Sequence, residues 1–547
     1  MRRLLPVLAA VALALGACSE SSPEPPPRPN TAQFSDVRPA PADRLNDGGT
    51  LRIGADGWPT DFNPWSTEGA SSSAAAQILA PTLGSPVRPT GDGDWEVDRD
   101  YAQSLDVVGT DPLTVEVTLH ADVVWQDGTP VGGDDLAAFV ELVQQADSPV
   151  AAHPAYGVVE SVEVVEAPST YRVVFSRSTA DWPAAVFAPV PASLSQDRER
   201  WDEGFNDEAI PSVGPFVVDM IDEEAGAVEL VRNPRWWGDQ PRLERIIWRA
   251  ADSEVLGEAY AADDLDALTL DADNVDAASA DRIDLRYGVR PEWTQLTLGG
   301  GSGPLADTAV RQAVVAAIDR SALVSADARE EADGVTEVMD SVVLLPRQRG
   351  YLAEAWSADR DTAEQLLDDA GWVPDDSGMR AKDGAALELR FPVPEGDAIA
   401  RQRAEAVADQ LAEVGIEVKV DEVAAENFAD EVIVALDFDL VGFSWNASPF
   451  PSEAVASRFA PVDSNQNFTG VASDELAEAV ERLRTAIDGE EWTQAVEAVD
   501  AAARSQASML PLAPLPVTMA VEPRVRNYGP STFAPIDWTI VGFEGGE

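Results

Sequence analysis

The sequence predicts an α/β protein built from several lobes, and three observations carry that prediction. Runs of alternating polarity exchange with longer helical patterns throughout the second half of the chain, an order typical of α/β lobes. The 547 residues exceed what one domain of about 150 residues usually holds, so three or four domains or lobes are expected. Hydrophobic residues make up 45% of the chain, which is enough for a large core.

The charge balance excludes one broad class of partner. The formal net charge is −59, and lysine occurs only at Lys382 and Lys419. A protein that follows nucleic-acid phosphates needs a basic surface, so no nucleic acid is expected as a partner. Solubility, a saline habitat or codon bias explains the acidic excess without any ligand.

The N-terminus predicts export and a lipid anchor. Arg2 and Arg3 precede an apolar run, Leu4 to Leu15, that is too short to span a bilayer. The following Leu-Gly-Ala-Cys resembles the bacterial lipobox, in which the cysteine, here Cys18, receives a lipid. We therefore expect a signal peptide at 1–17 and attachment to the outer face of the cytoplasmic membrane. Cys18 is the single cysteine, so no disulfide is possible.

A tether follows the predicted anchor. Residues 18–47 are rich in Ser, Glu and Pro and poor in large apolar side chains. Such a segment buries too little surface to fold and favours extended geometry.

The first half of the folded part reads mainly as strands. Alternating patterns predict strands at 49–56, 115–119 and 242–250. Two hairpins are expected from paired runs around short turns, at 161–166 with 171–175 and at 216–221 with 227–232.

The second half adds amphipathic helices. Asp307 is placed to cap a helix whose apolar side begins at Val310. Helices over 361–371 and 398–415 each end on glycine, and the second is followed by a strand at 416–420. A further helix at 473–487 aligns Leu476, Val480, Leu483 and Ile487 on one face. A helix after the turn at 127–130 is expected to begin near Leu136, capped by Asp134 or Asp135.

Five motifs then occur in one order behind the lipobox. They are WQDGTPVGGDDL (125–136), VGPFVVDMIDEEAGAVELVRNPRWW (213–237), LTLGGGSGPLADTAVRQAVVAAIDRSAL (296–323), DTAEQLLDDAGWVPDDSGMRAKDGAALELR (361–390) and NQNFTGVASDEL (465–476). The chain resembles the family 5 extracellular solute-binding proteins over roughly residues 48–547. These are the dipeptide, oligopeptide and nickel-binding components of ABC importers.

That resemblance implies a two-lobe periplasmic-binding-protein type II fold with an extra subdomain inserted in the first lobe. The implied first lobe is 48–72, 206–290 and 511–547, the subdomain is 73–205, and the second lobe is 291–510. The implied crossovers lie near Glu292-Trp293 and Ser508 to Pro511. A ligand would close the lobes by hinge rotation.

Lobe junctions collect aromatic walls and a few polar groups, which suggests three candidate places. The loop Thr60 to Trp65 offers Asn63 and Trp65, although a turn built by Asp61 and Asn63 is equally expected. Trp293 at the crossover suits hinge packing as well as ligand contact. Asn465 lies in a polar loop, where turn and capping chemistry is favoured.

A fourth place is GFSWNASPFPSE (442–453), which offers Trp445, Asn446 and Ser448. In the peptide-binding branch of the family the position of Ser448 is an Asp that pairs with the peptide ammonium. A serine carries no charge, so the usual route to peptides is put in doubt. Asp439 and Glu453 are nearby substitutes by sequence.

Three functions remain open. The first is a lipoprotein that captures a peptide or other small polar solute for ABC permease subunits. The second is a non-transport lipoprotein of the same fold, from an actinobacterial branch linked to phosphatidylinositol mannosides, that binds a glycolipid or glycan in cell-envelope assembly. The third is a hydrolase, which the sequence disfavours because it has no Gly-x-Ser-x-Gly and only two histidines. We expect a monomer with no enzyme activity, cofactor or metal.

Overall fold

The computed structural model describes residues 35–271, 273–276, 283–327, 337–353, 356, 358–462, 464 and 466–545. The predicted signal peptide, Cys18 and the tether as far as residue 34 lie outside the described residues, as does Asn465. Within these ranges, no helix is both long and apolar enough to cross a membrane.

One large sheet runs through the whole molecule. It has eight strands in the order β18 (Leu440–Asn446), β12 (Asp284–Leu298), β19 (Met509–Val521), β11 (Ala267–Leu270), β1 (Thr50–Asp56), β10 (Arg245–Ala251), β9 (Ala227–Arg232) and β8 (Phe216–Asp222). Strand β1 pairs in parallel with β10 and with β11, and all other pairs of this sheet are antiparallel.

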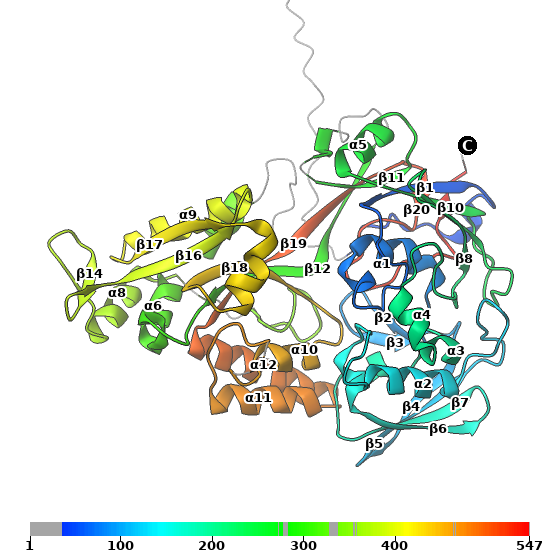
Figure 1. Cartoon of the computed structure of the whole chain (residues 1–547), viewed down its shortest axis with the longest axis horizontal. Coiled ribbons are helices and arrows are strands. Elements are labelled where there is room, and N and C mark those ends of the chain that lie inside the picture. Colours follow the sequence, from blue (N-terminus) through cyan, green and yellow to red (C-terminus); the bar gives the residue numbers. More distant parts are fainter. Residues whose placement is uncertain are drawn as a thin grey trace, which may run out of the picture.

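The long strands β12 and β19 join the two halves of the molecule (Figure 1). They pair antiparallel from Asp284 opposite Val521 to Thr297 opposite Met509. The register shifts between Val289 and Trp293, so this ribbon is interrupted midway. Two separate cores lie on either side of it, one reaching from Leu51 to Trp248 with part of the C-terminus, and one centred on 293–513. We call the parts built on them the first and second lobes.

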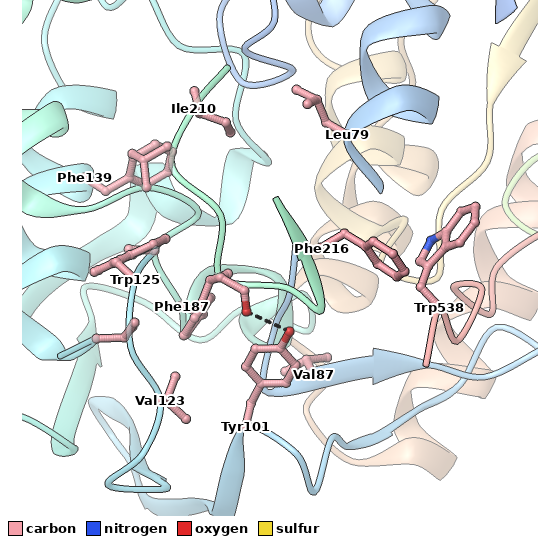
Figure 2. Packing of buried hydrophobic residues seen from close by; sticks show 14 of the residues in the cluster. Leu79, Val87, Tyr101, Val123, Trp125, Phe139, Phe187, Ile210, Phe216 and Trp538 are labelled. Carbon is pink, nitrogen blue, oxygen red and sulfur yellow. Dashed lines mark hydrogen bonds between the residues drawn. The ribbon is translucent and has the colours of Figure 1, made fainter. Parts of the chain in front are cut away.

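The first lobe carries a subdomain with its own sheet. That sheet has the order β4 (Ala102–Thr110), β5 (Leu113–Leu119), β7 (Thr170–Phe175), β6 (Val159–Glu166), and α2 (Gly133–Val143) packs against it. Figure 2 shows its aromatic packing, including Tyr101, Trp125, Phe139 and Phe216. The remaining elements are β2 (Val87–Pro89), β3 (Trp95–Val97), α1 (Ser73–Leu79), α3 (Ala192–Ser195), α4 (Arg198–Glu203) and α5 (Ser253–Ala261).

The second lobe adds a parallel pair and several helices. Strands β16 (Glu388–Pro394) and β17 (Glu417–Val423) are parallel and are connected by α9 (Ala398–Ala412). The other helices are α6 (Thr308–Ala317), α7 (Arg320–Asp327), α8 (Arg360–Asp369), α10 (Ser452–Arg458), α11 (Asp474–Thr485) and α12 (Gly489–Gln506). A small sheet comprises β13 (Val373–Pro374), β14 (Arg380–Lys382) and β15 (Ala385–Ala386), and β20 (Val525–Arg526) pairs with β21 (Gly542–Phe543) near the C-terminus.

Most local predictions are confirmed. Both predicted hairpins form, and Asp307 caps α6 by accepting from the Ala309 N–H at 2.9 Å. Gly371 and Gly415, which follow α8 and α9, have φ of 84° and 83°, a region that favours glycine.

Two details of the helix predictions were wrong. Helix α2 begins at Gly133, and Asp135 acts from inside its first turn by accepting from the Gly132 N–H. The apolar face of α11 stops at Leu483, because the helix ends at Thr485 and Ile487 is 36% exposed.

Candidate ligand-binding site

The loop that follows β1 is held by its own side chains. The Asp61 carboxylate accepts three hydrogen bonds, from the Asn63 N–H (2.8 Å), the Phe205 N–H (3.2 Å) and the Ser66 hydroxyl (2.7 Å). The side-chain oxygen of Asn63 accepts from the Trp65 N–H at 3.1 Å, which closes a second turn. The turn chemistry considered for Asp61 and Asn63 is therefore present, and it buries both side chains.

Two donors of this loop have no acceptor in the part of the chain that the structure describes. They are Nδ2 of Asn63 and Nε1 of Trp65, and both atoms are buried. The Trp65 ring packs against the first-lobe core, while its carbonyl oxygen accepts from the Ala151 N–H at 2.8 Å. The loop therefore combines a rigid backbone with two unused donors.

The end of β18 forms an aromatic wall on the second lobe. Trp293 lies opposite Trp445 and Gln295 lies opposite Phe443 in the antiparallel register. Residues directly opposite each other, and residues two apart on a strand, point to the same face of a sheet, so these four side chains share one face. Trp293 is only 1% exposed, whereas Trp445 is half-buried and stacks on Phe468 with a centroid distance of 5.7 Å.

Arg458, the last residue of α10, lies over this wall. Its guanidinium carbon is 4.5 Å from the ring centroid of Trp445 and 5.2 Å from that of Trp293. The side chain is 4% exposed, and its Nη1 donates to the Val342 carbonyl oxygen at 2.5 Å. Burial lowers the pKa of Arg458 to about 9, so the group stays charged at pH 7.

Sequence reasoning missed Arg458, although the sequence carried a signal for it. Val455, Arg458 and Phe459 have the spacing of one helical face, and Val455 and Phe459 are both buried. An arginine among buried apolar neighbours at this spacing indicates a charge held in the interior.

Ser448 and Asn446 have different surroundings. The Ser448 hydroxyl accepts from the Phe450 N–H at 3.0 Å, which makes a local turn. Its carbonyl oxygen accepts from Gln348 Nε2 at 3.1 Å. Asn446 ends β18 and is exposed. The hydroxyl that replaces the family's carboxylate is therefore already engaged.

The two acidic substitutes considered from the sequence are also engaged. The Asp439 carboxylate accepts from the Arg390 N–H at 2.8 Å within the second lobe. Glu453 is 5% exposed, and its carboxylate accepts from Arg177 Nη2 at 2.8 and 3.0 Å and from Arg484 Nε at 3.3 Å. Glu453 is thus paired with two arginines of the fold, and Asp439 holds the backbone of β16.

The loop after β18 contacts the first lobe directly. His153 Nε2 lies 3.0 Å from the Phe450 carbonyl oxygen, and the Phe450 ring packs against the first-lobe core. The Asp181 carboxylate accepts from the N–H groups of Ser452 (3.2 Å) and Glu453 (2.8 Å), the first residues of α10. We call the contact made by Asp181 and Arg177 with α10 the inter-lobe contact.

The inter-lobe contact is buried and charged. Thr179 also donates to Glu453, at 3.0 Å, so three first-lobe side chains act on the start of one second-lobe helix. Burial raises the pKa of the Asp181 carboxyl, and nearby His153, 3.7 Å away, opposes that rise. A carboxylate at a helix N-terminus is favourable because it faces unpaired N–H groups and the positive end of the helix dipole.

Metal ligands do not gather anywhere in the described ranges. No group of three or more His, Cys, Asp or Glu side chains there is placed to hold a metal ion. His120 Nε2 lies 3.0 Å from the Arg99 carbonyl oxygen, away from the inter-lobe contact.

Two lobes on a shared sheet, with aromatic rings and buried donors beside their contact, define a solute-binding protein of the type II periplasmic-binding fold. The profile of the family described as "Bacterial extracellular solute-binding proteins, family 5 Middle" matches residues 96–467, more than half of the chain. The chain belongs to the bacterial extracellular solute-binding proteins of family 5. It is thus a binding protein rather than an enzyme.

Individual relatives and structures agree with this assignment. The chain is 29% identical to the oligopeptide-binding protein OppA of Mycobacterium tuberculosis (strain H37Rv), over 97% of this chain and 92% of that protein. It is 27% identical to the "Probable monoacyl phosphatidylinositol tetramannoside-binding protein LpqW" of the same strain, over 75% of this chain and 69% of that protein. The solved structure of the periplasmic EDTA-binding protein EppA superposes with a TM-score of 0.81 at 24% identity, covering 93% of this chain and 98% of that chain.

Proposed function

We propose that the protein captures a small polar solute between its lobes and presents it to the permease subunits of an ABC importer. One observation carries the proposal. The wall around Trp445 lies beside the inter-lobe contact and holds buried donors without acceptors in the described structure, namely Gln295 Nε2, Trp445 Nε1 and Arg458 Nε. Unsatisfied buried donors are costly, and a bound solute with acceptor groups would satisfy them.

Closure would use the strand pair that joins the lobes. We propose that the two crossovers lie where β12 and β19 lose register, between Val289 and Trp293 and opposite them at Pro514 to Pro516, so that the second crossover follows the expected Ser508 to Pro511 by a few residues. The other lobe and subdomain boundaries given by the family resemblance belong to the same proposal. Binding would shift the chain toward the closed state by its differential affinity for that state.

The candidate contacts come from both lobes. On the first lobe they are Asn63 and Trp65, each with an unused buried donor. On the second lobe they are Trp293, Trp445, Asn446 and Ser448, and Asn465, which lies outside the described residues, is a candidate from the sequence alone. Export by the predicted signal peptide and attachment through Cys18 would hold the chain, as a monomer, at the outer face of the cytoplasmic membrane, where an importer takes its cargo.

The solute is a peptide or another acceptor-rich polar molecule. The likeness to OppA over 97% of the chain supports a peptide. Since Ser448, Asp439 and Glu453 are all engaged in the fold, we propose that the ligand is not held by an ammonium–carboxylate pair in this loop.

A glycolipid or glycan is the second candidate. The likeness to LpqW, whose name describes binding of a mannosylated lipid, favours it. In that case the protein would act in cell-envelope assembly without permease subunits.

Binding and closure of the mature chain test these alternatives together. A random tetrapeptide pool and vesicles containing phosphatidylinositol mannosides are added separately, and the midpoint of thermal unfolding and the radius of gyration are measured. A ligand at about a hundred times its Kd adds about 2.7 kcal/mol to the free energy of unfolding and should also contract the molecule. Stabilisation by the peptides alone supports the importer, and stabilisation by the lipid alone supports the second candidate. The proposal fails if neither probe stabilises or contracts the chain.

The anchor has a separate test. Expressed in a bacterium that processes lipoproteins, the full chain should partition with membranes, and the Cys18→Ser variant should not. Equal partitioning of both chains would contradict lipidation at Cys18.

A further inference from the structure

We propose that the Arg458 guanidinium is the counter-ion for an anionic oxygen group, a carboxylate or a phosphate, of the bound solute. This inference rests on the proposed function, because it names the chemistry that the second-lobe wall recognises.

Arg458 differs from the other buried arginines of the described chain. Those four, Arg286, Arg311, Arg320 and Arg380, each donate to three or more oxygen acceptors. Three of them also pair with an aspartate. Arg458 has a single hydrogen-bond acceptor, the Val342 carbonyl oxygen, and no carboxylate of the described ranges lies within ion-pair distance of it.

A buried guanidinium with one hydrogen-bond acceptor is unfavourable unless a further acceptor or a counter-ion binds to it. A guanidinium offers five N–H donors in a fixed fork, and leaving a buried charge without a counter-ion is strongly destabilising. The faces of Trp445 and Trp293 offset part of that cost through cation–π attraction, but they satisfy no N–H donor in the plane of the guanidinium.

The surrounding polar atoms also fit an anion. Gln295 shares the sheet face with Trp293, and its Oε1 already accepts from the Thr297 hydroxyl at 3.0 Å, so its Nε2 is the group left over. Trp445 Nε1 is a donor without an acceptor in the same part of the described structure. A guanidinium, an amide N–H and an indole N–H all donate to oxygen, and a cationic solute would be repelled here.

The wall is at the surface on one side only. Phe443 and Trp445 are half-buried, whereas Trp293, Gln295 and Arg458 are buried. An anionic group that enters beside Trp445 therefore meets the guanidinium in a poorly hydrated setting, where a charged hydrogen bond is strong.

The experiment compares charged and neutral forms of one probe. The probe is the random tetrapeptide pool as the free acid and as the C-terminal amide, with citrate and inorganic phosphate as separate carboxylate and phosphate arms. In the wild-type chain, the free acid or one of the two small anions should stabilise more than the amide. Arg458→Met should weaken binding of that anion by about ten- to a hundredfold and should weaken binding of the amide much less. Arg482→Met, which removes an exposed arginine of α11, is the matched control and should change neither.

A second readout separates ligand recognition from a structural role. Without any probe, Arg458→Met should unfold at the same temperature as wild type or higher, because it removes a buried charge that lacks a counter-ion. If Arg458→Met does not fold, Arg458→Lys decides, since it keeps the charge but loses the planar set of N–H donors, and it should weaken binding of the anion more than binding of the amide.

Two results with the variants would overturn the inference: an anion preference that survives Arg458→Met, or equal losses for acid and amide in Arg458→Lys. Wild-type chain that binds acid and amide equally, with no response to citrate or phosphate, overturns the inference but leaves the proposed function standing. A chain that binds neither the peptides nor the mannosylated lipid fails the proposed function itself.

Discussion

Asp181 caps a helix of the opposite lobe: its carboxylate accepts from the Glu453 N–H at 2.8 Å although the two residues are 272 positions apart in the chain. Ser452 adds a second N–H at 3.2 Å. N-terminal caps usually come from the residue just before a helix, and α10 instead has Pro451 at that position, with no side-chain cap of its own. The start of α10 therefore depends on the approach of the first lobe.

Asp181→Ala should loosen the lobes. The variant loses both bonds to α10, so we expect a larger radius of gyration in small-angle scattering and a loss of about 1–2 kcal/mol in the free energy of unfolding. Asp488→Ala is the control, because Asp488 also accepts from two N–H groups but caps α12 within the second lobe. An identical change of radius in both variants would argue against a role for Asp181 in holding the lobes.

Glu453→Gln should lower the free energy of unfolding more than Glu481→Gln does. The buried carboxylate of Glu453 serves Arg177 and Arg484, so removing its charge leaves Arg177 without a carboxylate partner among the described residues and Arg484 with Glu481 alone. We expect a loss of about 1–3 kcal/mol in urea unfolding. Glu481→Gln touches the same Arg484 from an exposed position and should cost under about 1 kcal/mol. Equal losses of free energy in the two variants would show that burial of Glu453 does not strengthen its ion pairs.

Asp61→Ala should disrupt the loop after β1. Three donors lose their acceptor inside the first lobe, which we expect to cost about 2–4 kcal/mol in the free energy of unfolding. Asp207→Ala, at an exposed position close to Phe205, should have almost no effect in the same urea titration. An unchanged free energy of unfolding in Asp61→Ala would mean that the loop does not depend on the hydrogen bonds to Asp61.

The free energy of unfolding should rise as the pH falls from neutral toward about 4. Burial raises the pKa values of Asp98, Asp135 and Asp181 above the usual 3.8. Above 3.8, the folded chain then binds more protons than the unfolded chain, so acid favours the folded state until the pH drops below that value. Protonation also relieves the repulsion within a chain of net charge −59. Unfolding midpoints at constant ionic strength check this, and a falling midpoint over that range would contradict it.

Local chemistry made much of the fold predictable. Alternation of polarity placed the hairpins, and Asp307, Gly371 and Gly415 marked helix ends because caps and left-handed positions depend on residue type within a few neighbours. Helix α2 shows the limit, since its N-cap is a glycine and Asp135, at the third helical position, accepts from the Gly132 N–H, so the helix starts before the predicted capping residue.

The inter-lobe contact could not be predicted in the same way. Arg177 and Glu453 are 276 residues apart, and no periodicity links them. Ser448 drew attention in the sequence because it carries no charge. In the structure its hydroxyl accepts from the N–H of Phe450, two residues later, and so closes a local turn. Arg458 resembled an ordinary C-terminal helix arginine, and only the register that sets Trp293 opposite Trp445 shows what it covers.

Strand β12 has one further consequence. Its register with β19 breaks just before Trp293 and again between Thr294 and Gln295, so these two residues of the wall lie within the crossover proposed above. A solute that pulls on Gln295 would apply torque to the backbone that has to bend, with no intervening linkage to transmit it. The segment of β12 that contacts the solute would then also be the segment that bends on closure. Stiffening it should weaken binding of the solute even where every contact to the solute is kept.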